Sequence, residues 1–173
     1  SPILFDDYRC GEYYDARLEI PHFYSADFDD SDFKNAIKVK SPRGEKRLCT
    51  ADPVKCYGEI KPVLVTKHLN GWLYDFGENN TGVCRLSIDG TEGQKITLYY
   101  GEWLKNGEFC RDNIRFGFQS EMQREFVQKC EYTCKSGYQT HTPSFIFNGF
   151  RYVYVEGITE AQANYGANAR SAR

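Results

Sequence analysis

The stretch Val83-Cys84-Arg85-Leu86-Ser87-Ile88-Asp89 alternates apolar and polar residues from Cys84 to Asp89. Successive side chains of a strand point to opposite faces, so Cys84, Leu86 and Ile88 would share one face and the polar residues the other. The next pair, Asp89-Gly90, is typical of a turn. The stretch therefore predicts a half-buried strand in a β-rich domain.

Similar short runs continue on both sides of this stretch, separated by turn residues, and none shows the 3.6-residue period of a helix. Asn70-Gly71 and Asn106-Gly107 favour tight hairpin turns. About seven strands in roughly 100 residues predict an all-β fold, an antiparallel β-sandwich or jelly roll. The predicted strands are residues 63–68, 72–76, 83–89, 95–102, 129–135, 142–147 and 150–156.

The two ends of the chain differ from this central part. Residues 1–57 contain Pro21, Pro42 and Pro53, an acidic run at Asp27–Asp32 and only brief apolar stretches, which predicts an irregular connector or the end of a preceding module. The sandwich is expected at 58–158, followed by a small, polar tail at 159–173 that is helical or disordered. The acidic run lacks the glycine and glutamate of an EF-hand, so a capped turn is expected there rather than a calcium site.

Composition excludes several classes of partner. A formal net charge of -2 over 173 residues gives no basic field for nucleic acid or an anionic membrane surface. No apolar run approaches the roughly 20 residues that span a bilayer.

Seven cysteines without a C-x-x-C pair indicate free thiols rather than a disulfide framework or a zinc site. Without a visible signal peptide, these thiols favour a cytoplasmic over a secreted protein, and no motif indicates a metal or another cofactor.

Two charged residues fall on predicted apolar faces. Counting by twos from Ile96 places Glu102 on the buried face of its strand, where an ionised carboxylate needs a partner. The same count places Arg151 on the face of Val153 and Val155. We therefore predict an ion pair between Glu102 and Arg151 that fixes the register of the two sheets.

An enzymatic interpretation uses Glu102 differently. A glycosidase needs two carboxylates on either side of the sugar bond, roughly 5 to 9.5 Å apart. The candidates for the second are Glu78 and Asp112, and neither lies in a recognisable motif. Loss of activity in Glu102→Gln would be the discriminating result.

Five segments form an ordered set: 59–63 (E-I-K-P-V), 74–82 (Y-D-F-G-E-N-N-T-G), 98–104 (L-Y-Y-G-E-W-L), 131–135 (E-Y-T-C-K) and 147–153 (F-N-G-F-R-Y-V). In this order they resemble the bacterial α-L-rhamnosidases of glycoside hydrolase family 78, specifically their concanavalin-like β-sandwich domain. Residues 11–18 and 28–31 are similar to the segments that join the preceding module of that family to the sandwich. The chain departs from the family pattern at 116–128, which is longer and more polar than the usual connection, and at Glu78, where glutamine is usual.

The resemblance implies a function for a longer protein. In the family an (α/α)6 barrel follows the sandwich and hydrolyses terminal α-L-rhamnosides with inversion. A barrel of that kind does not fit after residue 157, so the resemblance implies a non-catalytic domain whose partner is the catalytic barrel of the same enzyme.

The alternative is a carbohydrate-binding module for rhamnose-containing glycans. Its candidate contacts are Asp75 and Asn79, on a turn, and Trp103, whose ring could stack on a sugar face. Asp75 and Asn79 also fit a purely structural role, in which their side chains bond to the backbone of the turn.

Overall fold

The computed structural model describes residues 1–8, 10–114, 128–164 and 167–172. Residues 116–127 of the long polar connection therefore lie outside the described part. The elements, in chain order, are β1 (Ile3–Asp7), β2 (Gly11–Asp15), η1 (Ala16–Leu18), β3 (Cys56–Ile60), β4 (Leu64–His68), β5 (Gly71–Gly90), β6 (Lys95–Gly101), β7 (Trp103–Lys105), β8 (Glu108–Cys110), η2 (Asp112–Ile114), β9 (Lys129–Thr133), β10 (Gly137–His141), β11 (Asn148–Glu156), α1 (Glu160–Ala163) and β12 (Ala167–Ala172). The chain divides into two units, residues 1–19 with 54–173, and residues 20–53.

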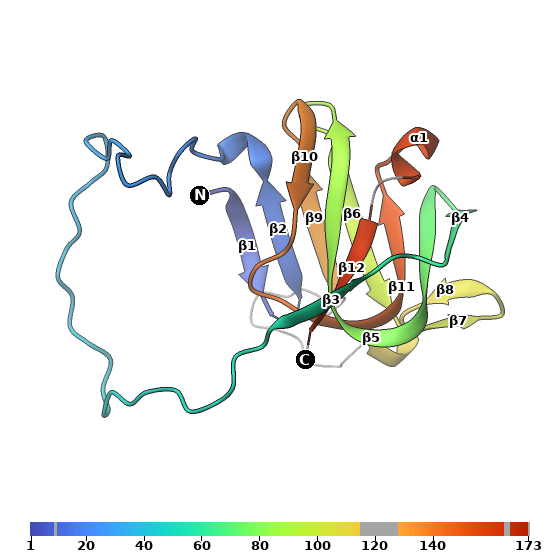
Figure 1. Cartoon of the computed structure of the whole chain (residues 1–173), viewed down its shortest axis with the longest axis horizontal. Coiled ribbons are helices and arrows are strands. Elements are labelled where there is room, and N and C mark those ends of the chain that lie inside the picture. Colours follow the sequence, from blue (N-terminus) through green and yellow to red (C-terminus); the bar gives the residue numbers. More distant parts are fainter. Residues whose placement is uncertain (9, 115–127, 165–166, 173) are drawn as a thin grey trace. The chain divides into compact units, whose positions relative to one another are not determined.

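The long strand β5 organises the first unit because it takes part in both layers of a β-sandwich (Figure 1). Its first part pairs with β4 and β11. Beyond β11 the neighbouring strands of the sheet are, in order, β6, β9, β2 and β1. We call these strands layer A. Its second part pairs with β10 and β12, and β12 pairs with β3. These strands are layer B, and the predicted all-β sandwich is confirmed.

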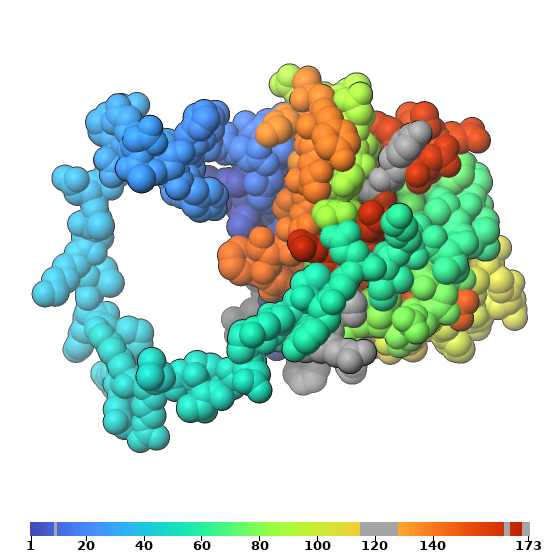
Figure 2. Space-filling view, in the orientation of Figure 1, coloured from blue at the N-terminus to red at the C-terminus, as the bar shows by residue number. Residues whose placement is uncertain are grey.

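The core lies between the layers, as the alternation predicts. Cys84, Leu86 and Ile88 of β5 are each at most 2% exposed. They pack in one cluster with inward residues of layer A, among them Ile96 and Tyr100 of β6. In the space-filling view β10 lies directly against the end of β5 (Figure 2). Removing these side chains from water is the main driving force for the fold.

Among the described strands, the ladders are antiparallel except for one pair. β2 runs parallel to β9, with Tyr13 opposite Glu131 and Asp15 opposite Thr133. Residues 1–57 were predicted to be an irregular connector, whereas β1, β2 and the first two residues of β3 lie in that range and belong to the sheet. Residues 159–173 were predicted to be a helical or disordered tail, and they contain both α1 and β12. β10 and β12, the strands that pair with the second part of β5, were both absent from the sequence prediction.

A register shift between β11 and β5 explains a further difference. Phe150 lies opposite Asn80 of β5, but Tyr152 lies opposite Asp75, so β5 has the additional residues between these pairs. At this shift Phe150 lies in the core, 0% exposed, in one cluster with Val153. Simple alternation would place Phe150 on the face of Tyr152, which instead packs in a separate cluster with Leu73 and Tyr154. The hairpin β7–β8 contributes Leu104 and Phe109 to that second cluster.

Two predicted hairpins are present, with one adjustment. Asn106 (φ 55°) and Gly107 (φ 84°) form the two-residue turn between β7 and β8. In the β4–β5 hairpin His68 lies opposite Gly71, so the turn residues are Leu69 and Asn70. Gly71 is required for another reason, because a Cβ atom there would lie 2.2 Å from the carbonyl oxygen of Val155.

The second unit, residues 20–53, has turns but no helix or strand. Phe23, Phe28 and Phe33 form an aromatic group with centroids 5.4 to 6.2 Å apart. In the acidic run the backbone N–H of Ser31 donates to Asp29 Oδ1 at 3.0 Å, which is a capped turn as predicted. Within the described residues no helix is long and apolar enough to cross a membrane.

All seven cysteines are thiols, and burial is expected to set their reactivity. Cys10, Cys84, Cys130 and Cys134 are buried, while Cys49 and Cys56 are exposed. Desolvation raises the pKa of Cys130 to about 12 and that of Cys134 to about 11, and the thiolate is the reactive form. With Ellman's reagent at pH 8, we expect Cys49 and Cys56 to react rapidly and the four buried thiols only after unfolding. Rapid reaction of all seven in the native protein would contradict this burial pattern.

Candidate functional site

The predicted site residues lie around the bend where β5 passes from one layer to the other. Asp75 accepts two hydrogen bonds from Arg151, from Nε to Oδ1 at 2.8 Å and from Nη2 to Oδ2 at 2.9 Å. The backbone N–H of Gly77 also donates to Asp75 Oδ1, at 2.7 Å, which is the turn contact expected for this aspartate. The two Arg151 bonds chiefly lower the pKa of Asp75, although desolvation opposes them.

This arrangement replaces the predicted pair between Glu102 and Arg151. Arg151 lies at the register shift between β11 and β5, and its guanidinium reaches Asp75 instead of Glu102. β6 ends at Gly101, so Glu102 is no longer held on the buried face of that strand. Counting by twos was wrong at both positions because each lies just outside regular pairing.

Glu102 is held by amides. Asn113 Nδ2 donates to Oε2 at 2.6 Å, and Asn79 Nδ2 donates to Oε1 at 3.3 Å. The structure thus brings together the predicted residues Asn79 and Glu102, and Trp103 follows Glu102 with 47% of its surface exposed. Neither Glu78 nor Asp112 has a hydrogen bond with Glu102 among the described contacts. In the part of the chain that the structure describes, no three His, Cys, Asp or Glu side chains gather to hold a metal ion.

The Asp75–Arg151 pair leads to a stability prediction. A carboxyl group whose pKa is lowered by folding adds stability above its unfolded pKa, and this stability is lost as the pH falls through the folded value. Asp75→Asn is expected to cost about 1 kcal/mol at pH 7, because Arg151 is 38% exposed and solvent screens the pair. The difference from the unsubstituted protein should shrink as the pH falls below about 4.

Urea unfolding at pH 7 and pH 3 checks this prediction. The exposed Asp27→Asn is the control, with an expected change within about 0.5 kcal/mol. An equal effect of Asp75→Asn at both pH values would show that the charge of Asp75 is not involved.

A buried carboxylate that the sequence did not indicate lies elsewhere, on β2. Glu12 is 1% exposed, and its Oε1 lies 2.9 Å from Nε2 of His141. Its Oε2 accepts a hydrogen bond from the backbone N–H of Ser144 at 2.9 Å. The ring of His141 lies 4.3 Å from that of Tyr14 and 4.8 Å from that of Tyr132, measured between centroids. These contacts fasten the start of the 142–147 segment to layer A.

The 142–147 segment itself was predicted to be a strand, but the structure shows a loop. His141 lies opposite Leu86 and Asn148 opposite Gly82, so six residues of the loop span the length of three residues of β5. The loop therefore bulges away from β5. Pro143 adds to this because it has no N–H to donate to a ladder.

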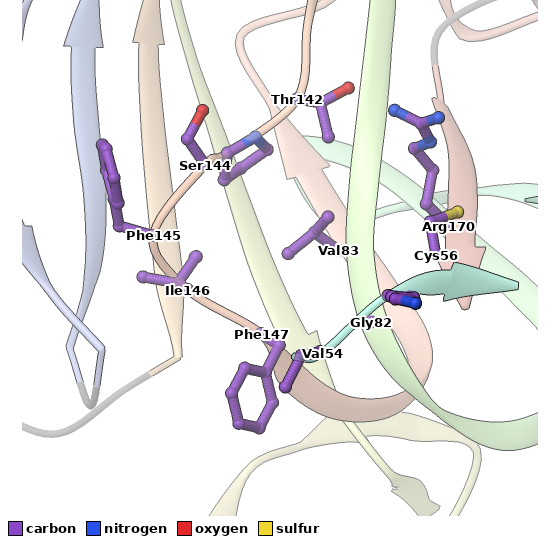
Figure 3. Close-up of a pocket in the computed structure, with 12 residues that line it drawn as sticks. Val54, Cys56, Gly82, Val83, Thr142, Ser144, Phe145, Ile146, Phe147 and Arg170 are labelled. Atoms are coloured by element: carbon purple, nitrogen blue, oxygen red, sulfur yellow. The ribbon is translucent and has the colours of Figure 1, made fainter. Parts of the chain in front are cut away.

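The bulge opens a pocket of about 350 Å³ (Figure 3). Its walls come from the loop, from β5, from β12 and from the beginning of β3. The described residues that line it include two cations, Lys55 and Arg170, and no Asp or Glu. The whole set is Val54, Lys55, Cys56, Gly82, Val83, Thr142, Pro143, Ser144, Phe145, Ile146, Phe147 and Arg170.

Comparisons with known proteins agree on one family. Residues 66–170 match the family described as the bacterial alpha-L-rhamnosidase concanavalin-like domain. An alpha-L-rhamnosidase of Formosa agariphila is 32% identical over 92% of this chain, which spans 17% of that protein.

Solved structures give the same result. The Streptomyces avermitilis alpha-L-rhamnosidase, complexed with L-rhamnose, matches 99% of this chain with a TM-score of 0.86 and 29% identity, over 16% of its own length. The alpha-L-rhamnosidase of Dictyoglumus thermophilum matches 99% of this chain with a TM-score of 0.84 and 27% identity, over 19% of its length.

Proposed function

Since this chain belongs to the bacterial α-L-rhamnosidases as their concanavalin-like domain, we propose that it is a non-catalytic part of such an enzyme. In this proposal the full-length enzyme hydrolyses terminal α-L-rhamnosides with inversion. The sandwich supports an (α/α)6 catalytic domain and packs against it. The proposal also places the protein in the cytoplasm, because its cysteines are thiols.

The setting of Glu102 carries this proposal. Inverting hydrolysis needs a carboxylic acid and a carboxylate about 6.5–9.5 Å apart, with room for a water molecule and the sugar between them. The described hydrogen bonds of Glu102 come from the amides of Asn79 and Asn113. Such bonds hold a loop in place but supply neither a second carboxylate nor a cleft. A role in the architecture of the domain fits them better than a role in catalysis.

A hydrolysis assay tests the proposal. We expect the isolated chain to release no nitrophenol from 4-nitrophenyl α-L-rhamnopyranoside above the rate in buffer. Turnover that persists through purification and disappears in Glu102→Gln would refute a non-catalytic role.

In a longer chain that also carries the catalytic part, Glu12→Ala should lower the temperature at which activity is lost and leave KM unchanged.

The exposed Trp103, next to Glu102, favours one second candidate, a module that binds rhamnose-containing glycans. Amide NMR during a titration with L-rhamnose, with and without calcium, separates the two functions. A supporting domain should give flat spectra up to about 10 mM sugar, which corresponds to binding weaker than roughly -3 kcal/mol. Saturable shifts at residues 75–82 or at Trp103 would establish the binding module.

A further inference from the structure

We propose that the pocket beneath the 142–147 loop binds an acidic saccharide, namely a sugar that carries a carboxylate, such as a uronic acid residue. The saccharide part of this inference rests on the proposed function within a glycoside hydrolase. The acidic part rests on the residues of the pocket alone. The site is distinct from the Asp75, Asn79 and Trp103 region, since none of these residues lines it.

The size and lining of the pocket suit a sugar. Its volume of about 350 Å³ lies within the roughly 300–1,000 Å³ typical of small-molecule sites. Val54, Val83 and Phe147 provide apolar surface for the C–H face of a ring, and the hydroxyl groups of Thr142 and Ser144 can bond to sugar hydroxyls. Figure 3 shows Val54 and Phe147 at one end of the site and Thr142 at the other.

The charges around the pocket favour an anion. Glu59 uses both carboxylate oxygens on Arg85, at 2.5 Å from Nη1 and 2.8 Å from Nη2. Nε of Arg170 lies 3.7 Å from Glu59, too far for a hydrogen bond, and the Arg170 side chain is 39% exposed where it lines the pocket. Lys55 lines the same pocket. Three cations are therefore balanced by one carboxylate, and a bound carboxylate would complete the pairing of Arg170.

The loop is fastened before any ligand binds. Glu12 holds His141 and the backbone of Ser144, and Pro143 has a restricted φ. Asn148 then joins the loop to the ladder opposite Gly82. A pocket whose walls are already held in place loses little conformational entropy on binding, which favours a small ligand.

Two sugars that differ only in the acid group provide the test. Amide NMR of the chain is followed during titration with methyl β-D-glucuronide and, separately, with methyl β-D-glucoside. We expect saturable shifts at Cys56, Val83, Ser144 and Phe147 with the glucuronide, and affinity about tenfold lower for the glucoside. Equal affinity for the two sugars, or no shifts with either at about 10 mM, would overturn the proposal.

Variants and a simple anion complete the design. Lys55→Gln, at an exposed position, and Arg170→Gln should each weaken glucuronide binding about tenfold, while Lys34→Gln outside the pocket should leave it unchanged. Unchanged binding in both pocket variants would refute the site. Sodium acetate should bind much more weakly than the glucuronide, and equal shifts with acetate would show that the sugar is not recognised. Rhamnoside hydrolysis by the chain would refute the proposed function but leave this binding result intact.

Discussion

Glu12→Ala is expected to lower the free energy of unfolding by about 3–5 kcal/mol. Glu12 is 1% exposed and bonds to both His141 and the backbone N–H of Ser144. Truncation removes the acceptor from the part-buried His141 ring and from the backbone N–H of Ser144, and it also creates a cavity. Because these partners begin the 142–147 loop, the pocket should loosen together with the fold.

Urea unfolding measures this effect, and two further variants interpret it. Glu12→Gln keeps an acceptor for Ser144 but removes the carboxylate from His141, so its cost should be intermediate. Glu45→Ala is the control, because Glu45 has 71% of its side chain exposed and should change stability by less than about 0.5 kcal/mol. A cost for Glu12→Ala as small as that of the control would mean that the buried contacts contribute nothing net.

The sequence predicted the part of the fold that rests on apolar alternation. β6 and the second part of β5 have apolar residues at every inward position, so their burial could be foreseen. β10 was missed because its inward residue is Gln139, which is 6% exposed. Gln139 is satisfied by bonds to Tyr132 and to the backbone of Lys135 and Gly137. A polar residue gives no apolar signal in the sequence, even where hydrogen bonds satisfy it in the interior.

The site was harder to predict for a related reason. A register shift depends on both strands, and between the pairs Tyr152–Asp75 and Phe150–Asn80 β11 has one residue, Arg151, while β5 has four. The sequence singled out Asp75, Asn79, Glu102 and Arg151 and paired Glu102 with Arg151, whereas the structure pairs Arg151 with Asp75 and Glu102 with Asn79. Glu12 was missed altogether, because an acidic residue in an irregular N-terminal region is normally exposed.

Gly11→Ala should be the more damaging of two glycine substitutions. Gly11 has φ 130°, and a Cβ atom there would lie 1.5 Å from the carbonyl oxygen of Lys129 and 2.6 Å from its carbonyl carbon. Lys129 cannot move aside easily, because it begins β9, lies opposite Tyr99 of β6, and its N–H donates to the carbonyl of Cys10 at 3.1 Å. We expect a cost above about 4 kcal/mol, in the range where a marginally stable domain unfolds.

Gly107→Ala separates the clash from backbone strain. Gly107 also has a positive φ, 84°, but a Cβ atom there meets nothing within 4 Å. Its substitution should cost only the strain of the left-handed conformation, about 1–2 kcal/mol. Urea unfolding, together with amide hydrogen exchange in β9, compares the two variants; if Gly11→Ala is insoluble while Gly107→Ala folds, the conclusion is the same. Equal costs for the two variants would mean that β2 can move away from β9 to make room for the added methyl group. The parallel pairing of β2 with β9 would then not be required to keep Glu12 in contact with His141 and Ser144.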